Sequence, residues 1–429
     1  MKPNSDGTIA SSLGSPTPSR LLPPLGMAVC LSLFGDLTLY AVLVTQLDTV
    51  GLSLGAAGIM LGINRLIRIP GNPLTGILLD RLGRRPLFIL GMLLGTLSTA
   101  GYGLLRGFWP FLISRLGWGV AWTLINVSGT TMTLDVSTDS DRGRIMGIFN
   151  AWLWSGFALG PLAGSFLVDI AGFRRGMLVC AALTALGLIV AAFALPETAP
   201  VGNRRTRRNP ELSLSLPRLA KRISPRRAGA FLADNPTLLT TAGLFFIFQL
   251  TGDGVTLSTI SLLLQQRLGQ DVGLGSLTLG VASVAGLLLA LRAVLAGAIG
   301  PLAGHLSDTR VGRWPLLVGC LISGTIGFVL LTLATSPAVI VLGVALGALS
   351  GGAALVTLGA QVGDVTPRGR QGALMGLYAT VGDIGSMIGP FLAFALLAFV
   401  DLRWIYLLCA LTFLIGLGLV ARMRKEGII

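Results

Sequence analysis

Long apolar runs separated by short charged stretches are the dominant pattern along this chain. A run of about 20 apolar residues can cross the hydrocarbon core of a bilayer as a helix. The pattern therefore predicts an all-α membrane protein with twelve transmembrane helices. The expected spans are residues 22–46, 52–79, 87–106, 109–132, 145–168, 174–195, 238–264, 275–303, 315–334, 337–362, 373–399 and 403–421.

The longest polar stretch, residues 199–236, lies between the sixth and seventh expected spans and is rich in arginine. We interpret it as a cytoplasmic linker that its charge holds near anionic lipid headgroups, in preference to a dedicated regulatory site. The predicted organisation is a disordered cytoplasmic tail (1–20), an N-terminal six-helix bundle (21–198), the linker (199–236), a C-terminal six-helix bundle (237–424) and a short cytoplasmic tail (425–429).

The two halves repeat each other at a register near 228 residues. The segment from Gly76 to Asp80 matches the segment from Gly304 to Asp308, and Asp135 matches Asp364. Further matches join Gly147, Gly156, Gly160 and Pro161 to Gly376, Gly385, Gly389 and Pro390. Such a repeat is typical of transporters whose halves rock about a central site, so we expect two pseudo-symmetric six-helix bundles.

Composition supports the membrane prediction. The chain is 53% hydrophobic and 12% charged, whereas soluble domains carry about a quarter charged residues. The net charge of +14 does not indicate a nucleic-acid partner. If the N-terminus is cytoplasmic, most Lys and Arg residues fall in cytoplasmic segments, which is the positive-inside bias. We therefore expect a multi-pass protein of the inner or plasma membrane with both termini cytoplasmic.

Few residues are available for metal, disulfide or ATP chemistry. The four cysteines lie in different spans, the chain has one histidine, and no lysine stands in a phosphate-binding loop. We expect no metal site, no cofactor and no ATP hydrolysis. A membrane enzyme would need a nucleophile with its base, so we expect no enzymatic activity. The expected partners are the bilayer, a small solute and protons, with the chain acting as a monomer.

Three motifs resemble those of the major facilitator superfamily. The run from Gly76 to Pro86 resembles the signature loop between spans two and three, and Arg115 to Gly119 resembles the fourth-span arginine motif. The fifth span is similar to the antiporter motif of the drug:proton antiporter branch, except at Ser165, where that branch usually has glycine. The motif residues in this chain are Gly147, Gly156, Gly160, Pro161 and Gly164. The resemblance implies the major facilitator fold and efflux by antiport.

The signature loop is expected to act as a conformational latch. Asp80 at a helix end can accept hydrogen bonds from a helix N-terminus in the other half, and the neighbouring arginines can pair with Asp135. The alternative is that these arginines only anchor the topology. The residues assigned to the latch are Gly76, Asp80, Arg81, Gly83, Arg84, Arg85, Asp135 and Asp308.

Seven charged residues lie within the expected spans: Asp36, Arg65, Arg68, Arg115, Asp253, Arg292 and Asp383. A charge near the bilayer centre costs several kcal/mol unless it is paired or hydrated, so each is a functional candidate. At 1.5 Å per residue, Asp36, Arg65, Asp253 and Arg292 all lie about 22–24 Å from the cytoplasmic ends of their spans. We therefore expect Asp36 to pair with Arg65, and Asp253 with Arg292.

Proton coupling requires a carboxylate that gains and loses a proton during the cycle. Asp36 is the first candidate, Asp253 the second and Asp383 the third; the alternative for each is a static ion pair. The candidates for binding the solute are Arg65, Arg68, Arg292 and Arg115. Four arginines against three acids favour an anionic or electron-rich solute. Proton-coupled efflux is preferred, with uptake or exchange of an organic anion as the alternative and a non-transporting receptor or scaffold as a remote one.

Overall fold

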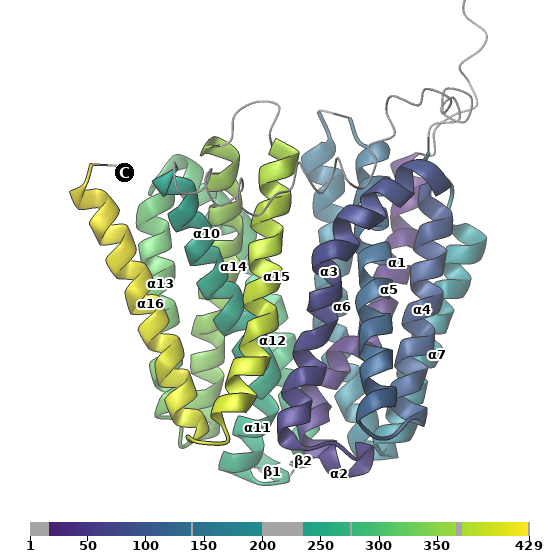
Figure 1. Cartoon of the computed structure of the whole chain (residues 1–429), viewed down its shortest axis with the longest axis horizontal. Coiled ribbons are helices and arrows are strands. Elements are labelled where there is room, and N and C mark those ends of the chain that lie inside the picture. Colours follow the sequence, from purple (N-terminus) through teal and green to yellow (C-terminus); the bar gives the residue numbers. More distant parts are fainter. Residues whose placement is uncertain (1–16, 139, 200–234, 275–276, 366–370, 428–429) are drawn as a thin grey trace, which may run out of the picture.

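The computed structural model describes residues 17–138, 140–199, 235–274, 277–365 and 371–427. Residues 1–16 and 428–429 of the predicted tails and residues 200–234 of the predicted linker lie outside the described residues. Residues 18–20, which were predicted to belong to a disordered tail, form the start of the first helix instead. The described chain forms two helical bundles side by side (Figure 1). This arrangement confirms the predicted all-α fold of two six-helix halves.

The N-terminal bundle begins with one broken helix. It runs through α1 (Pro18–Val42), the 3₁₀ turn η1 (Leu43–Gln46) and α2 (Leu47–Val50). Five long helices follow: α3 (Leu54–Leu82), α4 (Arg84–Leu104), α5 (Phe108–Asp135), α6 (Arg142–Ala171) and α7 (Phe173–Ala194).

The C-terminal bundle also begins with an interrupted helix. Its segments are α10 (Pro236–Phe248), the π-helix η4 (Gln249–Thr256) and α11 (Leu257–Leu268). A hairpin of β1 (Asp271–Leu274) and β2 (Leu277–Gly280), with Asp271 opposite Gly280, leads into the next helix. The remaining helices are α12 (Val281–Thr309), α13 (Arg313–Thr332), α14 (Pro337–Val365), α15 (Gln371–Leu396) and α16 (Leu402–Lys425).

Within the described residues, ten helical segments are long and apolar enough to cross a membrane. The two remaining long helices, α3 and α5, are not among them. These helices carry Arg65, Arg68 and Arg115. Charges inside a span lower its apolar character, so these two helices are the ones most adapted to a polar interior.

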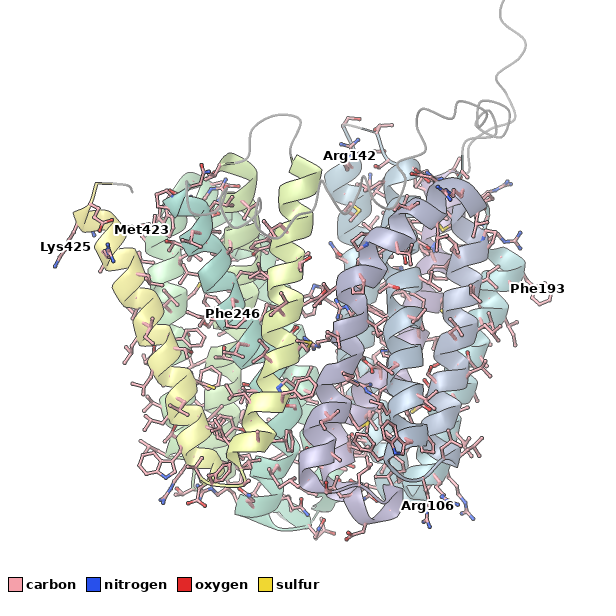
Figure 2. All side chains as sticks on the ribbon, viewed as in Figure 1. Arg106, Arg142, Phe193, Phe246, Met423 and Lys425 are labelled. Carbon is pink, nitrogen blue, oxygen red and sulfur yellow. The ribbon has the colours of Figure 1, made fainter. Side chains whose placement is uncertain are left out.

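Large apolar side chains face outward around the bundles. Phe193, Phe399 and Ile170 are each more than 80% exposed, at 87%, 86% and 82%. Figure 2 shows Phe193 pointing away from the bundle. A water-soluble protein rarely exposes so much contiguous apolar surface, whereas lipid tails accommodate it.

Glycine faces bring helices together in the same way in both halves. In the first half, Gly156 and Gly160 of α6 lie against the backbone of α1, where a Cβ at Gly160 would be 3.0 Å from the Leu33 carbonyl oxygen. In the second half, Gly385 and Gly389 of α15 lie against the α10–η4 helix. Small residues let helix backbones approach closely, so the repeated glycines seen in the sequence produce equivalent contacts.

Candidate functional site

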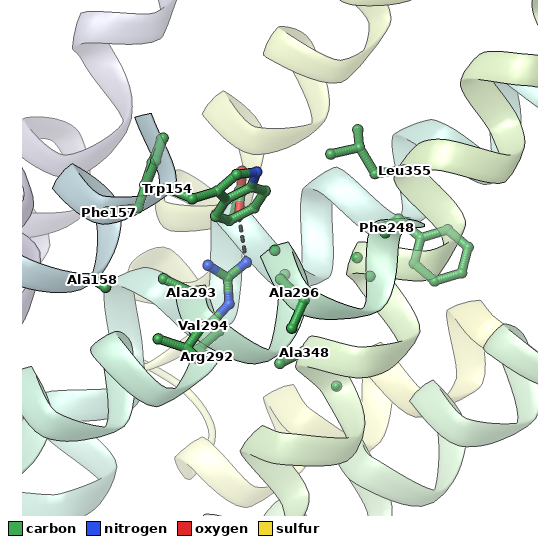
Figure 3. A pocket seen from close by; sticks show the side chains of 18 of the residues that line it. Trp154, Phe157, Ala158, Phe248, Arg292, Ala293, Val294, Ala296, Ala348 and Leu355 are labelled. Atoms are coloured by element: carbon green, nitrogen blue, oxygen red, sulfur yellow. Dashed lines mark hydrogen bonds and ion pairs between the residues drawn. The ribbon is translucent and has the colours of Figure 1, made fainter. Parts of the chain in front are cut away.

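A cavity of about 1090 Å³ lies between the two bundles. Its lining comes from α6 in the first half and, in the second half, from η4, α12, α13 and α14, with single residues at the end of α10 and in α16. Figure 3 shows Trp154 of α6 beside Arg292 of α12. The cavity is therefore asymmetric, because one helix of the first half meets most of the interior of the second.

The two bundles stand apart at the end of the molecule that carries Asp80 and meet at the other end (Figure 1). The cavity lining on α6 begins at Gly147 and that on α12 extends to Gly304, in the Asp80-side half of both helices. On α13 the lining includes Phe328 and Leu331, so the cavity also reaches toward the opposite end. A Cβ at Gly147 would meet no atom within 4 Å. At the opposite end the halves touch, where a Cβ at Gly58 of α3 would be 2.6 Å from Cβ of Phe394. The structure is thus closed at one end and open at the other.

A charged cluster at the inner end of the cavity joins the two halves. Arg292 forms an ion pair with Asp253, as predicted. Arg68 of α3 forms an ion pair with Asp383 of α15 at 3.0 Å. Arg65 donates to the backbone oxygen of Asp253 at 3.3 Å. Three guanidinium groups face two carboxylates, so the cluster carries a net charge of +1 when both acids are ionised.

Asp253 lies in the middle of the π-helix η4. The wider π-turn is rare and often marks a functional position, because it displaces a backbone segment from regular helical bonding. A Cβ at the adjacent Gly254 would be 2.8 Å from Cα of Gly389, so this segment also lies against α15. In the sequence, glycines on both sides of Asp253 indicate that the helix is locally less stable here, but they do not predict a π-helix.

The predicted pairing of Asp36 with Arg65 is wrong. Asp36 forms an ion pair with Arg115 of α5 instead. The similar depth of Asp36 and Arg65 in their spans did not determine which arginine pairs with Asp36. Helix α1 contacts α5, whereas α3 packs chiefly against α5 and α15. Arg65 therefore faces the other half, and Arg115 reaches Asp36.

Arg115 is the centre of a second polar cluster, which lies inside the first half. Its side chain is fully buried and donates to the Met60 carbonyl at 2.6 Å. It also donates to the hydroxyls of Tyr40 and Tyr102, at 3.3 and 3.4 Å, and its guanidinium lies over both rings. Arg115 was a candidate for binding the solute, but it joins α1, α3, α4 and α5 and does not line the cavity.

The signature loop forms the predicted charge contact in part. Arg84 pairs with Asp135 at 3.1 Å and with Asp80 at 3.7 Å. The Asp80 side chain is 78% exposed, so the predicted contact with a helix of the other half is not made in this state. The second copy repeats the arrangement: Arg313 pairs with Asp364 at 2.7 Å and with Asp308 at 3.6 Å.

Sequence reasoning missed Glu197 in this region. Its carboxylate accepts hydrogen bonds from the backbone N–H groups of Arg84 and Arg85, at 3.1 and 3.3 Å, and so caps the start of α4. The Arg85 side chain donates to the Ala192 carbonyl at 2.6 Å. Carboxylates favour helix N-termini, and the Pro-Glu-Thr sequence after the sixth span was the available signal.

The antiporter-like motif of α6 faces two helices. Gly156, Gly160 and Gly164 lie against α1, and the Thr38 hydroxyl of α1 donates to the Gly160 carbonyl at 2.9 Å. Ser165, where the motif usually has glycine, is fully buried and bonds to the Pro161 carbonyl at 2.6 Å. A Cβ at Gly286 of α12 would collide with this serine, so the glycine on the opposite helix provides the space.

The four cysteines are buried and free. Across the described part of the chain, no group of three His, Cys, Asp or Glu side chains could hold a metal ion.

Residues 25–291 and 278–427 match the sequence model of the Major Facilitator Superfamily. The chain belongs to this superfamily. It is 25% identical over 352 residues to tetracycline resistance protein, class C, of Escherichia coli, which covers 81% of each chain. It is 23% identical over 356 residues to multidrug resistance protein MdtG of Dickeya zeae, covering 82% of this chain and 81% of the relative.

Solved structures of the superfamily share its fold. A bacterial homologue of the human lysosomal transporter Spinster, in an inward-facing and occupied conformation, matches with a TM-score of 0.74 at 16% identity, over 96% of this chain and 98% of that one. The superfamily consists of multi-pass membrane transporters, so this chain is a membrane transporter.

Proposed function

We propose that this transporter exports a small solute in exchange for protons, by alternating access of the central cavity. The observation that carries the proposal is the contact between α6 and α1. The glycine face of α6 lies against Leu33, Phe34 and Thr38 of α1. Asp36 is on another face of the same stretch of α1 and pairs with Arg115 of α5. Movement of α1 along the glycine face of α6 would change the surroundings of a buried carboxylate.

Asp36 is the first candidate for the proton site. Its side chain is 10% exposed and pairs with Arg115, whose other contacts hold the guanidinium in place. Protonation of Asp36 would remove the ion pair and weaken the contacts of α1 with α5 and α3. Because α1 also packs against α6, proton binding could then change the position of α1 relative to α6. Asp253 and Asp383 remain the second and third candidates, because both lie in the cluster that joins the halves.

The relatives support export. The names of two relatives that align over four-fifths of the chain refer to resistance against tetracycline and against multiple drugs. Removal of a compound from the cell is one way in which a membrane transporter can confer such resistance. The antiporter-like glycine motif of α6 agrees with that direction.

The cavity favours an amphipathic solute. Aromatic rings of Trp154, Phe157 and Phe248 line it, and the charged groups among its lining residues are Asp253 and Arg292 (Figure 3). Ligand sites commonly combine an apolar wall with a few fixed polar groups. We propose that an anionic or electron-rich group binds at Arg292 near Arg65, because a guanidinium forks onto a carboxylate or phosphate.

Uptake or exchange of an organic anion is the second candidate function. The charged cluster that joins the two halves contains one arginine more than it has acids, and this excess positive charge favours an anionic solute. Arg65 contacts a backbone oxygen of Asp253 and not its carboxylate, so its charge is not neutralised by that contact. The direction of flux under an imposed proton gradient separates the two functions. A receptor or scaffold would show no solute counterflow in proteoliposomes.

We further propose that the protein lies in the inner or plasma membrane as a monomer, with both termini and the Asp80 end cytoplasmic. Under this topology the cavity faces the cytoplasm in the present state. Single cysteines placed at Arg144 and Gln266, which are exposed at opposite ends, test the orientation. Only the cysteine at position 266 should react with an impermeant maleimide in intact cells. Labelling at position 144 instead would show that the protein has the opposite orientation.

Export is tested in proteoliposomes. A thermal-shift screen first selects a solute, because a ligand that binds the folded state raises its apparent stability. An inside-acid proton gradient should then drive uptake of this solute into vesicles whose transporters have their cytoplasmic face outward. If the solute instead moves in the same direction as the protons, the protein is a symporter and the proposal of uptake replaces that of export.

A further inference from the structure

Two hydrogen bonds join the halves at the end of the molecule opposite Asp80. Asp169, in the last turn of α6, accepts from the backbone N–H of Ser283 at 2.8 Å and from its hydroxyl at 2.5 Å. Ser283 is the third residue of α12 and is 1% exposed. A carboxylate of the first half therefore caps the first turn of a helix in the second half.

The site is built around Gly280. This residue precedes α12 with extended backbone angles, φ −62° and ψ 148°, and offers no capping side chain. A Cβ at Gly280 would be 2.7 Å from an oxygen of the Asp169 carboxylate. Any larger residue would displace the carboxylate, so the missing side chain makes room for the cap from the other half.

The contact is electrostatically favourable and independent of the cavity charges. The first N–H groups of a helix have no partner within the helix, and a negative charge there is stabilised by the helix dipole. Asp169 supplies this charge to α12 only while the ends of α6 and α12 are together. At the other end, Asp80 is exposed. At one end of the molecule Asp169 thus contacts the other half, and at the other end Asp80 does not.

We propose that Asp169 is a latch that holds this end of the cavity closed, and that its release from α12 is a required step in opening that end. The halves of such transporters rock about a central site. Because α6 and α12 belong to different halves, opening this end separates Asp169 from Ser283 and breaks both hydrogen bonds. The proposal requires only that the protein alternates between access states, and it holds whichever solute is carried and whichever way it moves.

The test measures the access equilibrium by double electron–electron resonance on the full chain. One spin-label pair, at positions 48 and 266, reports the closed end, and a second pair, at positions 144 and 309, reports the open end; all four residues are exposed. Asp169→Ala should shift the equilibrium about tenfold toward the state that is open at the far end. A tenfold shift is about 1.4 kcal/mol, as expected for partly exposed hydrogen bonds to a charged group.

The shift should appear with opposite sign at the two ends: the 48–266 distance lengthens while the 144–309 distance shortens. General loosening of the protein would broaden both distributions instead. Gly280→Ala should reproduce the shift without removing the carboxylate, and the double variant should add little to either change. The control is Asp401→Ala, an exposed acid before α16 whose ion-pair partner, Arg403, belongs to the same half.

Unchanged distances in both Asp169→Ala and Gly280→Ala would overturn the latch. So would an equal shift in Asp401→Ala. If Asp169→Ala does not fold, Gly280→Ala and Ser283→Ala give the same two outcomes, because each weakens the contact from the α12 side.

Discussion

Replacing Arg115 with methionine removes a charge from the most enclosed ion pair in the described part of the protein. The Arg115 side chain is fully buried, and that of Asp36 is 10% exposed. The substitution keeps the length of the side chain but leaves the Asp36 carboxylate without its charged partner, and it leaves the Met60 carbonyl without its side-chain donor.

Removing one partner of a buried ion pair costs about 3–5 kcal/mol, because an uncompensated charge remains in a low-dielectric interior. Arg115→Met should therefore lower the free energy of unfolding by about that amount. The cavity-facing pair gives a smaller effect. The Arg292 side chain is 19% exposed and that of Asp253 is 34% exposed, so water screens the remaining charge, and Arg292→Met should cost about 1–2 kcal/mol.

Equilibrium unfolding in detergent measures both changes. Arg106→Met is the matched control, since this arginine is exposed at the end of α4 (Figure 2) and should change stability by less than about 0.5 kcal/mol. Adding Asp36→Asn to Arg115→Met should restore part of the lost stability, because the buried charge is then gone. If Arg115→Met is no more destabilising than Arg292→Met, burial does not determine the strength of these pairs and the reasoning fails.

Two further predictions concern the latch loop and the solute. Asp80→Asn should slow transport several-fold by shifting the access equilibrium, with solute affinity unchanged in a cross-linked protein; normal transport would leave the loop with a role in topology alone. Arg65→Lys should weaken solute binding in a thermal-shift titration, because a point charge cannot replace a forked contact. Arg292→Ala should weaken it more, and if Asp253→Ala added to Arg292→Ala restores binding, the pair is structural and the anion hypothesis fails.

The sequence predicted the fold well because each span is a local run of apolar residues and the internal repeat can be found by comparing the two halves of the chain. It also predicted the pairs between Arg84 and Asp135 and between Arg292 and Asp253, which lie on adjacent helices of one bundle. It failed for Asp36, because depth along a helix does not determine which face a side chain occupies. Arg65 could not be assigned to the other half without knowing how the halves meet.

Contacts between the halves were the least predictable part. Asp169 and Ser283 are 114 residues apart, and no motif links them. The pair between Arg68 and Asp383 likewise depends on how α3 packs against α15. Neither contact follows from the pattern within one half, because each joins helices of different bundles.

We propose that proton movement through Asp36 drives solute movement, and solute flux in proteoliposomes decides whether it does. Under an imposed proton gradient, the unmodified protein should accumulate the selected solute against its concentration gradient. Asp36→Asn should abolish this accumulation but still exchange labelled for unlabelled solute at equal concentrations. Undiminished accumulation by Asp36→Asn would contradict the account and move the proton site to Asp253 or Asp383.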